Sequence, residues 1–262
     1  MKQSVKTMFV TDADNTLWDT NKIYADAQLK LLESLEGILK IKGPSERRLD
    51  FVREIDQELA RLHPSGLKYP AKFLAEAMCY GLRGSSADKA ARKAWHQKKK
   101  FDREAVSAAV SEFETNLLNG KPELRSGVRT GLELLRPRVD LVIVATERSK
   151  EGCLAILEYH NIIKFIDKVI AAPKEPELFS RLARLAPPNS AKIMIGDQID
   201  RDILPAKVQG FVTVFFPGDF TPKWINAKYF QEADFTISSF GEIVDIVKMV
   251  QNGLSKASRE QM

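Results

Sequence analysis

Met8-Phe9-Val10-Thr11-Asp12-Ala13-Asp14-Asn15-Thr16 is the stretch of the sequence that decides the fold. It begins with an apolar run typical of a buried strand, and such strands normally end in turn residues rather than in two acids. Asp12 and Asp14 would repel each other here unless a cation or a shared proton offset their charges. The stretch therefore indicates a metal ion, an acid–base pair, or both, at the end of the first strand.

The sequence after Lys121 alternates between apolar runs and amphipathic segments, which predicts strands separated by helices. Together with a first strand at residues 6–11, strands are expected at 139–145, 168–172, 192–195, 212–216 and 235–237. Helices are expected at 150–159, 175–185, 203–209 and 241–251. Apolar strands joined by helices form a parallel sheet that is covered on both faces. The sequence therefore predicts an α/β fold with a Rossmann-like parallel sheet.

The segment between the first strand and Lys121 has a different pattern, in which apolar residues recur with a helical period. It contains no convincing strand, and glycine, proline and serine break it at 43–45, 63–66 and 84–86. We expect an α-helical cap domain inserted into the sheet domain as a lid. The expected division is a core of residues 1–18 and 121–252, a helical cap of residues 19–120, and a flexible polar tail of residues 253–262.

The composition is that of a soluble globular protein, with 44% hydrophobic residues, 29% charged residues and a formal net charge of +5 over 262 residues. No apolar run is long enough to span a bilayer, and the N-terminus has no signal-peptide pattern. We therefore expect a cytoplasmic protein with no membrane partner. The most basic stretch, residues 92–103, is interpreted as a solvated helix face rather than a nucleic-acid-binding surface.

Polar residues follow the expected strands at the positions where ligands of an open parallel sheet bind. They are Thr146-Glu147-Arg148, Lys174 and the stretch from Gly196-Asp197 to Asp202. Carboxylate oxygens are the ligands that Mg²⁺ prefers, and hydroxyl and ammonium groups donate to phosphate oxygens. Each motif alone has a structural explanation, such as a helix cap, a turn acid or a surface lysine. Their convergence at one edge of the sheet favours a site for Mg²⁺ and a phosphoryl group.

These motifs resemble those of the haloacid dehalogenase-like (HAD) hydrolase superfamily. The DxDxT signature is matched by Asp12-Ala13-Asp14-Asn15-Thr16, the threonine of the second motif by Thr146, and the lysine of the third by Lys174 with the trailing Pro176. The GDxxxxD motif is matched by the residues from Gly196-Asp197 to Asp202. The helical insertion lies between the first and second motifs, as in the phosphatases that carry a helical C1 cap.

The resemblance implies a mechanism for the two acids of the first motif. Asp12 would attack phosphorus and carry an aspartyl-phosphate intermediate. Asp14 would protonate the leaving oxygen and then take a proton from the water that hydrolyses the intermediate. Mg²⁺ would be held by the Asp12 carboxylate, the Asp14 main-chain carbonyl and Asp197.

The resemblance also implies roles for the later motifs. Thr146 and Lys174 would bind the phosphoryl oxygens, and Asp202 would orient metal-bound water or Lys174 from outside the ligand set. Two residues depart from the common pattern, because Glu147 and Arg148 follow Thr146 where the family often has a small or amide residue. Arg148 could contact the substrate, and Glu147 would repel a phosphate unless it were turned away or paired with Arg148.

The predicted function is hydrolysis of a small phosphate monoester by a Mg²⁺-dependent phosphatase, with a small phosphorylated metabolite as its partner. The cap would select that substrate, with Lys68 as the cap residue we favour for contact with it. A phosphomutase on the same scaffold stays open, as does a non-catalytic binding module with a basic cap. A dehalogenase is not expected, because its chemistry needs no acid at the position of Asp14. The sequence indicates no oligomeric state.

Overall fold

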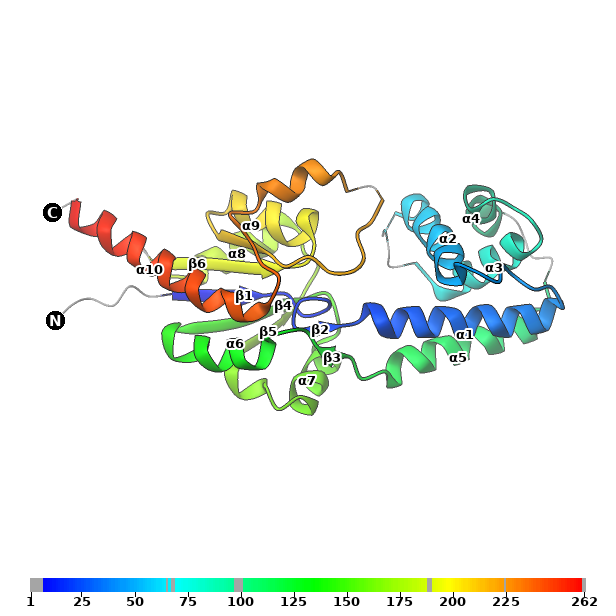
Figure 1. The fold of residues 1–262 in the computed structure, drawn as a ribbon, viewed down its shortest axis with the longest axis horizontal. Helices are drawn as coiled ribbons and strands as arrows, with labels where there is room; N and C mark the ends of the chain where they lie inside the picture. Colours follow the sequence, from blue (N-terminus) through cyan, green and yellow to red (C-terminus); the bar gives the residue numbers. More distant parts are fainter. Residues whose placement is uncertain are drawn as a thin grey trace. The chain divides into compact units, whose positions relative to one another are not determined.

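The structure is a computed structural model that describes residues 7–64, 66, 69–96, 101–187, 190–223 and 225–260, with the backbone alone at 227 and 254–260. The chain divides into two compact units, each described by itself below (Figure 1). A sheet unit contains Met1–Thr20, Pro122–Thr221 and Ile225–Met262. A helical unit contains Asn21–Lys121 together with Pro222–Trp224, a short segment that the sequence did not lead us to place there.

The sheet unit contains a six-stranded sheet in which every pairing is parallel, in the order β5-β4-β1-β6-β7-β8. The strands are β1 (Thr7–Thr11), β4 (Leu141–Thr146), β5 (Lys168–Ala171), β6 (Ala191–Gly196), β7 (Val212–Phe215) and β8 (Phe235–Thr236). Parallel strands need crossover connections, which the intervening helices supply. The structure confirms the predicted α/β fold class.

The side chains of β1 alternate between two apolar cores, as the two-residue period of a strand requires. Phe9 belongs to a core covered by α6, α7 and α10, whereas Met8 and Val10 belong to a core covered by α8 and α9. These helices are α6 (Val128–Leu135), α7 (Lys150–Tyr159), α10 (Ile243–Glu260), α8 (Pro176–Leu185) and α9 (Leu204–Val208). The sheet is therefore covered on both faces, as predicted, and its strands are apolar on both sides.

The central position of β1 brings the polar ends of three strands together. Thr11 is paired with Val144 of β4 and with Ile195 of β6, and the Asp12 amide donates to the Ile195 carbonyl over 2.9 Å. The loops that follow β4 and β6 therefore leave the sheet on either side of Asp12. This register places the acids of the first motif between the second and fourth motifs.

Two short features of the sheet unit differ from the prediction. Trp18–Asp19 (β2) pairs with Glu123–Leu124 (β3) in an antiparallel ladder that is too short to give a periodic pattern. The helix expected at 203–209 is shortened to α9, and a π-helical turn at Ile199–Ile203 precedes it. The carbonyl of Gln198 accepts from the amides of both Asp202 (2.8 Å) and Ile203 (3.3 Å), which widens this turn.

The backbone of α10 continues to Glu260, beyond the end that the sequence predicted for this helix, and the flexibility of the tail after residue 252 stays a prediction. We expected the helix to end at Gln251, two residues before Gly253. A single glycine within a helix costs only about 1 kcal/mol relative to alanine, and lysine, alanine, arginine and glutamate around it all favour helix. The local preference of the last residues therefore extends the helix.

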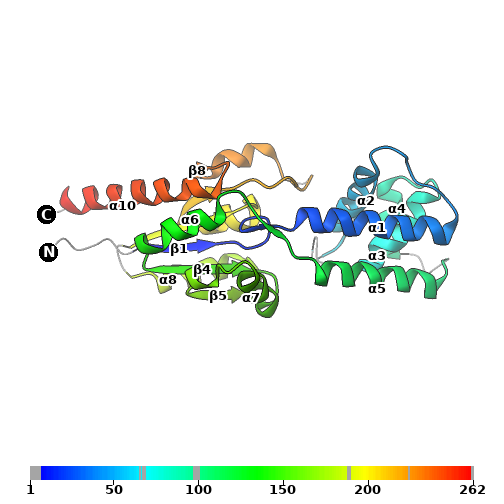
Figure 2. The ribbon, with the colours of Figure 1, turned by 60° about the horizontal axis from the view of Figure 1, so that its bottom comes forward.

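The helical unit has a core of its own, which includes Leu31, Leu35, Ile55 and Met78. Its helices are α1 (Asn21–Leu39), α2 (Arg48–Leu62), α3 (Ala71–Leu82), α4 (Ala87–His96) and α5 (Arg103–Asn119). The two long helices α1 and α5 run side by side (Figures 1 and 2). Within the part of the chain that the structure describes, no helix of either unit is both long and apolar enough to cross a membrane.

Candidate active site

Asp12 is the centre of a polar cluster at the carboxyl end of β1. Its side chain is buried, and its two oxygens have different partners. Oδ2 accepts a hydrogen bond from the Thr16 hydroxyl over 2.9 Å, and Oδ1 accepts from the Lys174 ammonium. The spacing of the first motif explains the first contact, because the chain turns back after Ala13, whose carbonyl accepts from the amides of Thr16 and Leu17.

Lys174 is a buried cation between two carboxylates. Its Nζ contacts Asp12 and also lies 2.6 Å from Oδ1 of Asp202. Burial alone would lower the pKa of Lys174, but the charges of Asp12 and Asp202 outweigh burial and raise it. Lys174 therefore stays protonated and brings the loop after β5 to the ends of β1 and β6.

Three carboxylates gather around this ammonium group. Asp12, Asp197 and Asp202 each offer an oxygen, and the three oxygens lie within 4.8 Å of one another. Burial raises the pKa of Asp12 to about 7 against the opposing charge of Lys174, and burial together with the charge of Asp12 raises the pKa of Asp197. With all groups charged, three carboxylates and one ammonium leave two net negative charges, which a divalent cation would neutralise.

The chemistry of this cluster fits a hard divalent ion. Oδ1 of Asp197 is buried and has no hydrogen-bond partner among the described residues. A buried carboxylate oxygen without a donor is costly, and coordination to a cation would satisfy it. The donors at the cluster are all oxygens, which is the set that Mg²⁺ prefers.

Asp202 reaches the cluster because of the π-helical turn and Gly196. A Cβ atom added to Gly196 would lie 2.3 Å from Cγ of Asp202, so only glycine leaves room for this side chain. The other oxygen of Asp202, Oδ2, accepts from the Gln198 amide over 3.1 Å. Asp202 is thus oriented by its own loop and contacts Lys174, and the supporting role implied by the resemblance stays a prediction.

Thr146 and Asp14 lie on the same edge of the sheet but outside the carboxylate cluster. Thr146 is buried, and its hydroxyl accepts from the Arg148 amide over 3.1 Å. The carboxylate of Asp14 is turned toward Arg148 and the indole of Trp18. The metal ligand predicted from Asp14 was its main-chain carbonyl, and that role stays a prediction.

Glu147 forms a link between three loops that we did not predict. Its carboxylate accepts from the Lys174 amide over 3.1 Å and from the guanidinium of Arg201. From the sequence we considered instead a pair of Glu147 with Arg148. Sequence spacing gives no signal for the observed pair, because Glu147 and Arg201 lie on loops that follow different strands.

Arg125 is a second residue whose role the sequence did not indicate. Its guanidinium donates to the carbonyls of Asn15, Phe216 (3.0 Å) and Pro217 (2.6 Å), and it stacks 3.4 Å from the ring centroid of Phe216. Asn15 has a positive φ of 59°, so the turn of the first motif is held in a conformation that few residues adopt. Arg125 ties that turn to the end of β7.

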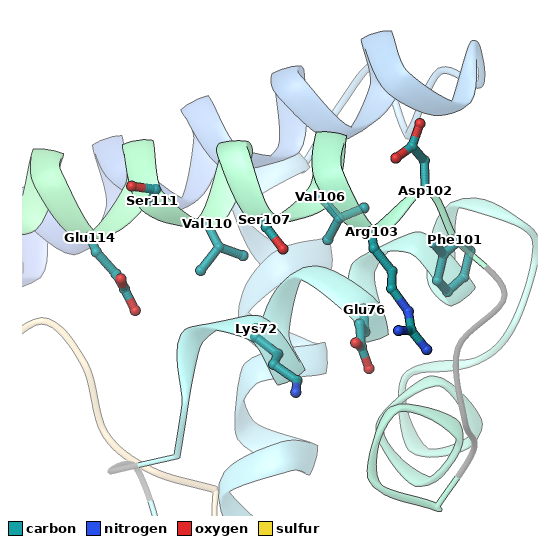
Figure 3. A pocket seen from close by; sticks show the side chains of 10 residues that line it. All are labelled: Lys72, Glu76, Phe101, Asp102, Arg103, Val106, Ser107, Val110, Ser111 and Glu114. Carbon is teal, nitrogen blue, oxygen red and sulfur yellow. The ribbon is translucent and has the colours of Figure 1, made fainter.

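The helical unit contains a separate cavity of about 260 Å³ between α3 and α5 (Figure 3). Its lining includes Lys72, Glu76, Phe101 and Arg103, and none of the predicted site residues. Lys68, the cap residue that we favoured for substrate contact, lies outside the described residues. The carboxylates of the motifs therefore lie at the sheet edge and not in this cavity.

The comparisons with known proteins identify the family of the chain and its fold. A family model described as haloacid dehalogenase-like hydrolase matches residues 7–210, which include Asp14, Thr146, Lys174 and the three clustered carboxylates. The chain belongs to the haloacid dehalogenase-like hydrolase family. No match was found among curated proteins.

Solved structures show the same fold. A candidate HAD hydrolase from Bacillus subtilis, YfnB, bound to magnesium, has a TM-score of 0.60 and 16% identity, covering 93% of this chain and 99% of its own. A predicted phosphoglycolate phosphatase from Haemophilus somnus has a TM-score of 0.59 and 16% identity, and the match covers 94% of this chain and 99% of that one. A candidate β-phosphoglucomutase from Thermotoga maritima has a TM-score of 0.59 and 18% identity, and the match covers 93% of this chain and 99% of that one. At these identities the likeness is one of fold.

Proposed function

We propose that the chain is a Mg²⁺-dependent phosphatase that hydrolyses a small phosphate monoester through an aspartyl-phosphate intermediate. The observation that carries the proposal is the cluster of three carboxylates around one buried ammonium group at the end of β1. Such a cluster lowers the stability of the fold unless its charges are well paired, because each buried charge loses its hydration. It is useful where a cation and a phosphoryl group have to be bound together.

The metal ion would be held by the carboxylates of Asp12 and Asp197 and the main-chain carbonyl of Asp14, with Asp202 beside them. When bound, the ion would neutralise charge on the phosphoryl oxygens and screen them from the attacking carboxylate. The magnesium-bound relative from Bacillus subtilis supports this choice of ion.

The phosphoryl group would be bound by Thr146 and Lys174. An ammonium group has three N–H donors, and two of those of Lys174 face Asp12 and Asp202. The third donor would be directed to a phosphoryl oxygen. The hydroxyl of Thr146, which accepts from the Arg148 amide, would donate its own proton to another phosphoryl oxygen.

The reaction would proceed in two displacements. An oxygen of Asp12 attacks phosphorus, the bond from phosphorus to the ester oxygen breaks, and Asp14 gives that oxygen a proton. Water then attacks phosphorus, the bond to Asp12 breaks, and the proton of water passes to Asp14. The products are an alcohol and inorganic phosphate, and both aspartates return to their initial states. We propose that the helical unit selects the alcohol part of the phosphate ester.

A phosphomutase would use the same first displacement and differ only in the acceptor, which would be a hydroxyl of the product instead of water. The candidate β-phosphoglucomutase among the relatives supports keeping this alternative. The two functions differ in a simple measurement, because only a phosphatase releases inorganic phosphate in proportion to the substrate consumed.

The test is hydrolysis of an aryl phosphate with and without Mg²⁺ by the purified chain. We expect Mg²⁺-dependent release of phosphate that Asp12→Asn abolishes. Asp200→Asn is the matched control, because Asp200 is an exposed acid in the π-helical turn that is not one of the three carboxylates able to share a metal ion. Hydrolysis that survives Asp12→Asn, or salt-sensitive nucleic-acid binding without turnover, would contradict the proposal.

A further inference from the structure

Arg148 contacts Asp14 through two of its guanidinium nitrogens. Nε lies 3.1 Å from Oδ1 and 3.2 Å from Oδ2 of Asp14, and Nη2 lies 3.0 Å from Oδ1. Both side chains are about one-third exposed. A guanidinium that contacts both oxygens of a carboxylate fixes its orientation, whereas an ammonium group would fix only its position.

Two further contacts make this arrangement rigid. The indole Nε1 of Trp18 donates to Oδ1 of Asp14 over 2.8 Å, and Trp18 is fully buried in the sheet core. The amide of Arg148 donates to the hydroxyl of the buried Thr146, and Ser149 then caps α7 by accepting from the Gly152 amide. The backbone of Arg148 is therefore held by a hydrogen bond, and the Asp14 carboxylate is oriented by both Arg148 and Trp18.

We propose that Arg148 is a positioning residue that orients the Asp14 carboxylate for its proton transfers, rather than a residue that contacts the substrate. The proposal rests on the function proposed above, in which Asp14 serves both displacements. It replaces our expectation from the sequence, because Nε and Nη2 of Arg148, which could bind a substrate anion, contact Asp14 instead.

The orientation observed here suits the second displacement. Both oxygens of Asp14 accept hydrogen bonds, so the carboxylate is held in one orientation. In that step the water oxygen bonds to phosphorus, the bond from phosphorus to Asp12 breaks, and the water proton moves to Asp14. Without Arg148 the carboxylate would sample several orientations, and the attack of water would slow while the first displacement on an aryl phosphate, whose leaving oxygen needs no proton, would not.

The test is pre-steady-state hydrolysis of an aryl phosphate by Arg148→Gln in the presence of Mg²⁺. We expect a burst of aryl alcohol, accumulation of phosphorylated chain in the quenched reaction, and a fall in kcat of roughly 100-fold. KM should fall in parallel, because kcat/KM reports the first displacement, which does not change. Arg148→Lys should recover only part of kcat, because lysine keeps the charge but not the planar fork. Arg181→Gln, an exposed arginine of α8, is the matched control and should behave as wild type.

The outcomes separate the possible roles of Arg148. A rise in KM at constant kcat would assign Arg148 to substrate binding, and unchanged kinetics would remove it from the reaction. Either result would overturn the proposal. A loss of kcat without accumulation of phosphorylated chain would also overturn it.

A second readout does not depend on activity. The indole N–H resonance of Trp18, assigned by its absence in Trp18→Phe, should shift in Arg148→Gln and stay in place in Arg181→Gln, because Asp14 is its acceptor. An unmoved resonance would overturn the orienting role. If the wild-type chain hydrolysed no phosphate ester, the proposed function would fail, and the resonance would still decide whether Arg148 orients Asp14.

Discussion

A Cβ atom placed on Gly196 would lie 2.3 Å from Cγ of Asp202, a separation that real Cβ atoms do not reach. The contact involves the middle of the Asp202 side chain rather than a flexible end. Asp202 is fully buried and contacts Lys174, so it has no free space into which it could move. The absence of a side chain at Gly196 is therefore a condition for the carboxylate cluster.

Gly196→Ala should lower the free energy of unfolding of the sheet unit by about 1–3 kcal/mol, the range typical of overpacking, and should abolish phosphatase activity. Calorimetry and the aryl phosphate assay would measure the two effects. Gly37→Ala is the control, because an added Cβ at Gly37 in α1 meets no atom within 4 Å. Wild-type stability and activity in Gly196→Ala would show that Asp202 is not held as described.

Divalent cations should stabilise the chain in the absence of any phosphate ester. A ligand that binds only the folded state at 100 times its Kd adds about 2.7 kcal/mol to the free energy of unfolding, so Mg²⁺ should raise the thermal midpoint. Asp197→Asn should remove this response, and Asp200→Asn should keep it. A thermal midpoint of the wild-type chain that does not change when Mg²⁺ is added would argue against a metal site in the carboxylate cluster.

Glu36 should make the stability of the helical unit depend on pH. Its buried carboxylate accepts from the Gly43 amide over 2.9 Å and from Nη1 of Arg48 over 2.8 Å. Burial alone would raise the pKa of Glu36, but the hydrogen bonds from Arg48 and Gly43 outweigh it and lower the pKa below the ordinary 4.5. A lowered pKa in the folded state means that this contribution is complete above the unfolded-state pKa and is lost as the pH falls through the folded-state pKa.

We therefore expect Glu36→Gln to lower the free energy of unfolding by about 1.5–3 kcal/mol at neutral pH, as for hydrogen bonds to charged groups. The difference from wild type should be constant down to about pH 5 and shrink below it. Urea unfolding at several pH values measures it, with the exposed Glu33→Gln as control. A difference that persists unchanged at the lowest pH would mean that the carboxylate charge is not the cause.

Glu76 should be a source of instability in the helical unit. It is buried in α3 at the cavity of Figure 3, and it has no hydrogen bond or ion pair with any described residue. The Glu76 side chain has little contact with water and no donor among the described residues to replace it, so an apolar group of similar length, Glu76→Met, should raise the free energy of unfolding by about 1–3 kcal/mol. Glu114→Met, at an exposed residue lining the same cavity, should change it little. A destabilised Glu76→Met would indicate a partner for this carboxylate.

The fold and the site residues could be predicted where a repeating pattern exists. The apolar run before Asp12 and those before Thr146 and Gly196 are all strands, and their parallel pairing brings these residues to one edge. Parallel strands buried on both faces leave a strong signal, because nearly every side chain in them is apolar. The contact of Asp202 with Lys174 did not follow from such a pattern; it was one of two roles that the resemblance to the family implied.

The contacts that could not be predicted are those between loops. The pairs Glu147–Arg201 and Arg148–Asp14 depend on how each loop turns after its strand. The hydrophobic periodicity that predicts strands and helices does not predict the conformation of such loops. The π-helical turn at Ile199–Ile203 and the two-residue strands β2 and β3 are likewise shorter than any pattern that could indicate them. It is therefore harder to predict which residues of a site form ion pairs than to predict which residues belong to the site.

The strand order has a consequence for how the chain is made. β1 is translated first yet lies third across the sheet, between two strands that begin at Leu141 and Ala191. Residues 21–121 leave the ribosome before either neighbour of β1, so a nascent chain can complete most of its helical unit while β1 still has both edges exposed. A ribosome that stalls between these two strands would leave an apolar strand with one open edge, the kind of surface that recruits chaperones or seeds aggregates.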